Sequence, residues 1–100
     1  MSYHLDFTDK ANFDIAAHKK VGNKAILNKL FTLLGELEEH PFTGTGKPEQ
    51  LKYNLSGCWS RRINHEHRLI YEVSEDAVVI LSAKGHYWKY PTEVKLSLNS

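Results

Sequence analysis

The second half of the chain contains the residue types that cleavage of an RNA phosphodiester requires. RNA can be cut without a metal ion, because its own 2′-hydroxyl attacks the phosphorus once a base removes the hydroxyl proton and an acid protonates the departing 5′-oxygen. A carboxylate and an imidazole suit these two proton transfers, and a permanently charged guanidinium suits the phosphate oxygens. The candidates are Glu49, Arg62, Arg68 and His86. Most small proteins contain such residues, so they permit a ribonuclease without identifying one.

Other reactive or base-stacking residues in this half are open to plainer interpretations. Trp59 and Tyr87 can stack on unpaired bases, although Trp59 is predicted to be a core residue. His65 and His67 would share one strand face, but the sequence places no third ligand beside them, so we expect no metal site. Cys58 is the only cysteine. We expect it to be a small buried residue and not a nucleophile.

The composition is ordinary for a globular domain and does not indicate a partner. Hydrophobic residues make up 41% and charged residues 25% of the chain, and the formal net charge is +1. All three arginines lie in the second half, which suits phosphate contacts, although a mixed solvated surface explains it nearly as well. No apolar run approaches the roughly 20 residues of a membrane helix, and the first residues lack the layout of a secretory signal. We expect a cytoplasmic protein without a membrane partner.

Hydrophobic periodicity predicts the elements that must position these candidates, beginning with a strand and two helices. Residues 3–7 alternate in polarity and predict a strand. Thr8 or Asp9 can cap a following helix that runs to about Lys20. The second predicted helix spans residues 24–39 and carries an apolar stripe. The stripe consists of Leu27, Leu30, Leu34 and Leu37.

The rest of the chain predicts a loop and a set of short strands. Pro41 ends the second helix, and a loop follows over residues 41–50. Residues 44–47 of this loop resemble a fragment of a phosphate-binding loop, but the spacing of their glycines and lysine does not fit one, so we predict a turn. The predicted strands are 51–55, 59–64, 68–74 and 78–84. Short strands joined by tight turns pair antiparallel. We therefore expect an α+β fold in which two helices cover one face of an antiparallel twisted sheet and leave the other face open.

One composite motif includes most of the candidate residues. It reads H-P-F-T-G-T-G-K-P-E-Q-L-K-Y-N-L-S-G-C-W-S-R-R-I over residues 40–63, then H-E-H-R-L-I-Y over 65–71, and ends in the pair His86-Tyr87. This pattern resembles the YoeB/Txe toxins of the RelE superfamily over about half the chain, in the right order and nearly without gaps. The resemblance implies one RelE-like toxin domain over residues 1–100, with 88–100 as a C-terminal extension.

The resemblance also implies a role for each matched residue. Glu49 would be the general base, His86 the general acid, and Arg68 a stabiliser of the phosphorane; Arg62, Lys52 and Tyr87 would bind the substrate. Arg61 and Arg62 must face opposite sides of a strand, and the motif favours Arg62. Plainer interpretations stay open for each residue: a solvated charge for Glu49, an ion pair with Glu72 for Arg68, a histidine bonded to backbone for His86, and edge packing for Tyr87.

The function that the resemblance implies is that of a type II toxin. Such a protein is a ribosome-dependent, metal-independent mRNA endoribonuclease without a cofactor. Its partners would be a YefM-type antitoxin, mRNA in the ribosomal A site, the 70S ribosome, operator DNA through the antitoxin complex alone, and a second copy of the chain in a homodimer. The alternative is a catalytically silent module of the same fold that binds antitoxin and operator DNA.

Two features of the chain depart from the family's pattern. Cys58 stands where the family often has an aromatic residue, and thirteen residues follow Tyr87, where these toxins commonly end. Residues 94–98 of this tail alternate in polarity and predict an edge or shared strand, with disorder as the alternative. We expect the tail to leave the His86-Tyr87 edge uncovered.

Overall fold

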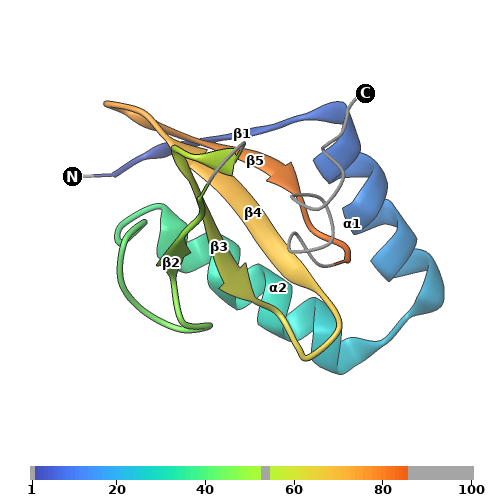
Figure 1. Cartoon of the computed structure of the whole chain (residues 1–100). Helices are drawn as coiled ribbons and strands as arrows, with labels where there is room; N and C mark the ends of the chain where they lie inside the picture. The colour runs from blue at the N-terminus through green and yellow to red at the C-terminus, as the bar shows by residue number, and fades with distance from the viewer. Residues whose placement is uncertain (1, 53–54, 86–100) are drawn as a thin grey trace.

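Two helices cover one face of a five-stranded sheet in the computed structural model (Figure 1), as predicted. The structure describes residues 2–52 and 55–85, so His86, Tyr87 and the predicted strand in the tail lie outside the described residues. The elements are β1 (His4–Phe7), α1 (Asp9–Val21), α2 (Lys24–Leu37), β2 (Glu49–Gln50), β3 (Cys58–Arg62), β4 (Arg68–Val73) and β5 (Ala77–Ser82). None of the helices in the described part is long and apolar enough to cross a membrane.

The sheet is mixed, which corrects the expectation of a wholly antiparallel sheet. Its strand order is β1-β5-β4-β3-β2. The four strands after the helices pair antiparallel as predicted, but β1 pairs parallel with β5, with His4 opposite Ala77. A parallel pair needs a long connection between its strands. Here everything from α1 to β4 provides that connection.

Each helix begins directly after a capping residue, and for α1 this residue is Thr8, one of the two predicted candidates. The Thr8 side chain accepts a hydrogen bond from the Ala11 amide, and the Asn23 side chain accepts one from the Ile26 amide, so each satisfies a first-turn donor. Gly22 ends α1 with φ of 77°, in the left-handed region that favours glycine. The second helix ends at Leu37, two residues before the predicted end. Its buried stripe is Leu30, Leu33, Leu34 and Leu37, while Leu27 is half-buried.

The predicted strand over residues 51–55 is wrong for the residues that the structure describes there, since none of 51, 52 and 55 lies in a strand. The strand is instead β2, at Glu49–Gln50, inside the predicted loop. The Leu51 amide still donates to the Cys58 carbonyl, but the Leu55 amide donates to the Lys52 carbonyl and not to a neighbouring strand. Leu51 and Leu55 belong to a small apolar cluster with Cys58 and Ile70, and their apolar spacing therefore reflects packing in this cluster.

Cys58 is buried, as predicted. Burial raises the pKa of the Cys58 thiol, and the nearby Glu72 carboxylate raises this pKa further. A raised pKa keeps the thiol protonated and therefore weakly nucleophilic.

Candidate functional site

Glu49 and Arg68 come together from two separate strands. The Arg68 guanidinium lies 3.2 Å from the Glu49 carboxylate, measured from Nη1 to Oε1. The same nitrogen donates a hydrogen bond of 2.9 Å to the Ser60 hydroxyl. The strand register explains why Glu49 and Arg68 are close. Glu49 pairs with Ser60 on β3, and Arg68 pairs with Arg62, which lies two residues after Ser60 on the same strand. Three neighbouring strands thus place a carboxylate and a guanidinium side by side.

These side chains lie on the sheet face opposite the helices. Side chains alternate between faces along a strand, so Ser60 and Arg62 share the face of Cys58, which belongs to the apolar cluster apart from the helix-packed core. On β4, Arg68 likewise shares the face of Ile70, another member of that cluster. The open face predicted from the sequence therefore carries both Glu49 and Arg68.

The two partners differ in their exposure. The Glu49 side chain is 49% exposed, so it can meet a molecule that approaches from solvent, whereas the Arg68 side chain is only 12% exposed. The Ser60 hydroxyl holds Arg68 on the sheet. Arg68 pairs with Glu49 and not with the alternative partner Glu72, which lies across from Cys58.

The structure describes two of the other four predicted site residues. Arg62 and Lys52 are exposed, and Arg62 ends β3 directly across from Arg68. His86 and Tyr87 lie outside the described residues. The structure therefore brings together Glu49, Arg68 and Arg62 on one face, while the positions of the proposed acid and of Tyr87 stay predictions.

Arg61 faces the helix side and is fully buried. Its guanidinium is 2.9 Å from the Glu36 carboxylate, donates to the Thr43 carbonyl at 2.7 Å and to the His40 carbonyl, and its Nε donates to the Tyr71 hydroxyl. One side chain thus ties α2, β4 and the loop before β2 together. Sequence reasoning placed Arg61 away from the site but missed this anchoring of the loop that leads to Glu49.

Gly46 holds the same loop close to β3. Its φ is 84°, and a β-carbon there would lie 2.8 Å from the Arg62 carbonyl oxygen. The Gly46 carbonyl accepts a hydrogen bond of 2.7 Å from the Arg62 amide. Only glycine combines this backbone conformation with so close an approach. Residues 44–46 lie in a bend and a turn, in agreement with the prediction; the close packing of Gly46 against β3 was not predicted.

Replacing Arg61 with Met should lower the free energy of unfolding by roughly 2 to 4 kcal/mol, because carbonyls of the loop lose their donor in a buried place. Urea unfolding followed by circular dichroism measures this change. The matched control is Arg62→Met at the neighbouring exposed position, which should stay within about 0.5 kcal/mol of the unaltered protein. Equal effects of the two substitutions would show that Arg61 does not anchor the loop.

Glu36 makes part of the protein's stability depend on pH. A hydrogen bond from the Thr45 hydroxyl lowers the pKa of Glu36 despite partial burial, and the Thr45 amide and Arg61 lower this pKa further. The unfolded chain therefore takes up the proton first as pH falls. The stabilisation is present above the ordinary glutamate pKa of about 4.3 and is lost as pH falls through the lower pKa of the folded state.

We expect Glu36→Gln to destabilise the protein at neutral pH and to have a smaller effect in acid, below the ordinary glutamate pKa. The neutral amide loses the attraction to Arg61 that the carboxylate has only when ionised. Urea midpoints measured on both sides of that pKa test this difference. Glu38→Gln, at the exposed end of α2, is the control. A destabilisation by Glu36→Gln that is the same in acid as at neutral pH would contradict the expectation.

The two histidines of the predicted metal alternative do not share a strand. His65 and His67 lie in the turn between β3 and β4, where His65 is exposed and His67 is buried. The Asn64 carboxamide forms this turn by accepting hydrogen bonds from the Glu66 and His67 amides. Within the described ranges, no three histidine, cysteine or acidic side chains gather as metal ligands would.

Comparisons of sequence and of structure with known proteins find the same family of bacterial toxins. Residues 7–87 match the family described as "YoeB-like toxin of bacterial type II toxin-antitoxin system". Toxin YoeB of Escherichia coli K12 is 49% identical over 65 residues, which are 65% of this chain and 77% of that protein. A solved YoeB dimer from Staphylococcus aureus is 39% identical, with a TM-score of 0.76 over 87% of this chain and 100% of that one. The YoeB–YefM complex from the same organism is 40% identical, with a TM-score of 0.74 over the same shares.

Proposed function

Because this chain belongs to the YoeB-like toxins of bacterial type II toxin-antitoxin systems, we propose that it is an endoribonuclease that cuts messenger RNA on the ribosome. The contact between Glu49 and Arg68 on the open face of the sheet carries this proposal. A carboxylate and a guanidinium this close offer a proton acceptor and a phosphate ligand to one substrate group. The proposed reaction needs no metal ion and no cofactor, because the 2′-hydroxyl of the RNA is the nucleophile and protein side chains make both proton transfers.

The first half of the reaction belongs to Glu49 and Arg68. The half-exposed Glu49 carboxylate removes the proton of the 2′-hydroxyl, and the 2′-oxygen forms a bond to the adjacent phosphorus. Negative charge accumulates on the phosphate oxygens in the resulting phosphorane. Arg68, which the Ser60 hydroxyl orients, stabilises this charge with little reorganisation, and the exposed Arg62 and Lys52 contact neighbouring phosphates.

The second half of the reaction needs an acid. The bond from phosphorus to the 5′-oxygen breaks, and the imidazolium of His86 gives its proton to that oxygen. The products are an upstream fragment with a 2′,3′-cyclic phosphate and a downstream fragment with a 5′-hydroxyl. Tyr87 holds or stacks on the substrate nucleotides.

The proposed partners other than mRNA and the 70S ribosome follow from relatives. The S. aureus YoeB structures include a dimer and a complex with YefM, so we extend to this chain a homodimer and a YefM-type antitoxin. An acidic antitoxin segment that orders on contact would cover or distort the site. Operator DNA is bound only through the antitoxin complex. The cytoplasm is the proposed compartment, because ribosomes and mRNA are there.

The direct test adds the purified chain to ribosomes that translate a defined mRNA. Primer extension then maps new 5′ ends, and we expect cuts at ribosome-occupied codons and none in the same mRNA free in solution. Equal cleavage of free mRNA would show that the activity does not depend on the ribosome. No cleavage by a folded chain would favour the silent module that only binds antitoxin and operator DNA.

Expression of the chain without an antitoxin should arrest growth, because cleavage of translated mRNA stops protein synthesis. The double substitution Glu49→Ala and His86→Ala should relieve the arrest. Growth curves after induction, together with pulse labelling of new protein, measure both effects. Harmless expression of the soluble, unaltered chain would again support the silent alternative.

A further inference from the structure

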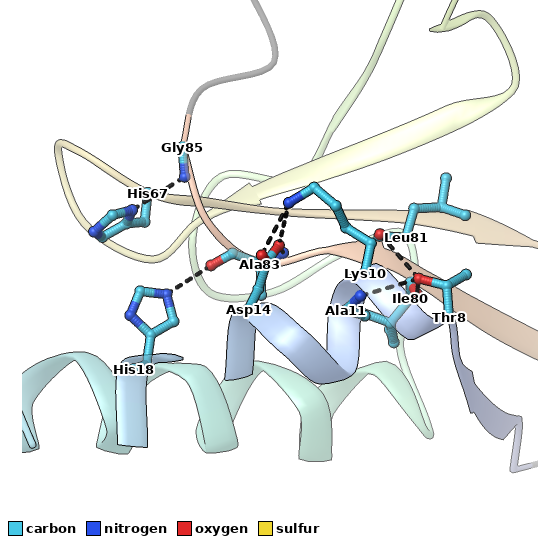
Figure 2. Close-up of polar contacts among 10 residues, drawn as sticks. All are labelled: Thr8, Lys10, Ala11, Asp14, His18, His67, Ile80, Leu81, Ala83 and Gly85. Atoms are coloured by element: carbon cyan, nitrogen blue, oxygen red, sulfur yellow. Dashed lines mark hydrogen bonds and ion pairs between the residues drawn. The ribbon is translucent and has the colours of Figure 1, made fainter. Parts of the chain in front are cut away.

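The chain beyond β5 is held by side chains from other elements (Figure 2). Strand pairing of β5 with β1 ends at Ile80, and its pairing with β4 ends at Ser82. Residues 83–85 follow, and the next residue in the sequence is His86. Four hydrogen bonds fix Ala83 and Gly85 through their backbone groups, and Figure 2 draws those that side chains make. Such a set of bonds gives the end of this segment one defined position.

Two of the four bonds come from one face of α1. The Ala83 amide donates to the Asp14 carboxylate at 2.9 Å, and the Ala83 carbonyl lies 2.8 Å from Nε2 of His18. A carbonyl oxygen only accepts, so Nε2 of His18 carries the proton. Asp14 and His18 are four residues apart and therefore adjacent on the helix. They are only 2% and 5% exposed, and together they bind both backbone groups of Ala83.

The other two bonds tie Gly85 to the turn and strand that carry Arg68. The Gly85 amide donates to Nδ1 of His67 at 3.1 Å, and the Gly85 carbonyl accepts from the Arg68 amide at 3.0 Å. The His67 ring also meets the His18 ring edge-on, with 4.7 Å between centroids. One polar cluster thus joins α1, the residue before His86 and the backbone of Arg68.

Docking of α1 alone does not explain this cluster. Ala11 and Ile15 already pack α1 into the core, and the Thr8 hydroxyl lies within hydrogen-bonding distance of the Ile80 and Leu81 carbonyls. A buried carboxylate and a buried imidazole are costly to desolvate compared with apolar side chains. The polar residues also fix the orientation of the Ala83 backbone, since they bind both its amide and its carbonyl group.

We infer that Asp14 and His18 are positioning residues for the catalytic step, because they fix the backbone of Ala83 in the segment that directly precedes His86 in the sequence. This inference rests on the proposed function. Neither side chain touches the substrate. Both act through the Ala83–Gly85 backbone, whose far end is bonded to Arg68. Misplacement of a reacting group by about 1 Å lowers reaction rates by up to roughly 10²-fold while substrate binding is kept.

The experiment compares His18→Leu with His18→Gln on translating ribosomes. Leucine fills the space without a donor, whereas the glutamine amide can donate from nearly the place of Nε2. We expect His18→Leu to lower the maximal cleavage rate by roughly 10- to 100-fold without changing the half-saturating ribosome concentration, and His18→Gln to restore most of the rate. A role in folding alone would lower the melting temperature of His18→Leu without changing the rate of the folded protein.

A second pair keeps the test decisive if His18→Leu does not fold. Asp14→Leu removes the acceptor of the Ala83 amide, while Asp14→Asn keeps an acceptor oxygen and loses only the charge that pairs with Lys10. We expect slow cleavage by the first variant and near-normal cleavage by the second and by the control Lys10→Met. Unchanged cleavage by folded His18→Leu or Asp14→Leu overturns the inference and leaves the proposed function standing. No cleavage by the unaltered chain overturns both.

Discussion

Glu49→Gln is expected to lower the rate of mRNA cleavage on ribosomes by roughly 10²- to 10⁴-fold, the usual contribution of a general base. Glutamine has nearly the same shape as glutamate and can still accept a hydrogen bond from Arg68, but it cannot remove the 2′-proton. Single-turnover cleavage at saturating ribosomes measures the loss. Glu75→Gln, an exposed carboxylate in the turn before β5, is the matched control and should cleave normally.

Loss of stability cannot produce an effect of this size. The Glu49 carboxylate is half-exposed, and an ion pair with one partner in solvent contributes about 0 to 1 kcal/mol. The largely buried Arg68 guanidinium keeps its hydrogen bond to Ser60, and the glutamine oxygen remains available to it as an acceptor. The fold of Glu49→Gln should therefore persist, as its melting temperature can verify. A folded Glu49→Gln protein that cuts at the normal rate would remove Glu49 from the mechanism and leave the ion pair as a purely structural contact.

The helices and their core face could be predicted because their signals are local. Thr8 lies three residues before the amide that it caps, and the leucines of α2 recur every three or four residues. Such signals need no knowledge of the rest of the chain. The polar residues on the buried face of α1 were not identified from the sequence, although Asp14 and His18 share the helical spacing of Ala11 and Ile15 in one buried stripe.

The sheet was predicted less well at its two edges, where pairing depends on distant residues. The partner strand of β1 lies about 70 residues later in the sequence, with His4 opposite Ala77. No local sequence pattern predicts such a parallel pair. At the other edge, the apolar residues Leu51 and Leu55 predicted a strand, but they pack in a small cluster with Cys58 and Ile70. The true strand, β2, contains the polar pair Glu49–Gln50, which has no apolar alternation for sequence analysis to detect.

The candidate site was located by a motif and not by periodicity. The motif named Glu49 and Arg68, yet the predicted loop over 41–50 gave no register that would bring them together. That register comes from β2, whose Glu49 lies across from Ser60. The anchoring role of Arg61 was also invisible in the sequence, because its acceptors come from α2, the following loop and β4. Contacts of this kind become predictable only when the strands are placed.

His86→Ala should lower cleavage by roughly 10²- to 10⁴-fold as well, while ribosome binding stays unchanged. The missing function is protonation of the 5′-oxygen, which leaves poorly as an alkoxide. RNA with sulfur in place of that bridging oxygen separates the acid from the base, because a thiolate leaves without a proton. Single-turnover cleavage of both substrates by His86→Ala and by Glu49→Gln is the measurement.

The two variants should respond in opposite ways to the sulfur substrate. His86→Ala should regain most of its rate, since its only defect has been bypassed, whereas Glu49→Gln should stay slow because the 2′-proton must still be removed. If His86→Ala remains slow with the sulfur leaving group, His86 acts on substrate binding or on the phosphorane and is not the acid. A free 3′-hydroxyl on the upstream fragment would instead show that an external water attacks, and the general-base role of Glu49 at the 2′-oxygen would be lost with it.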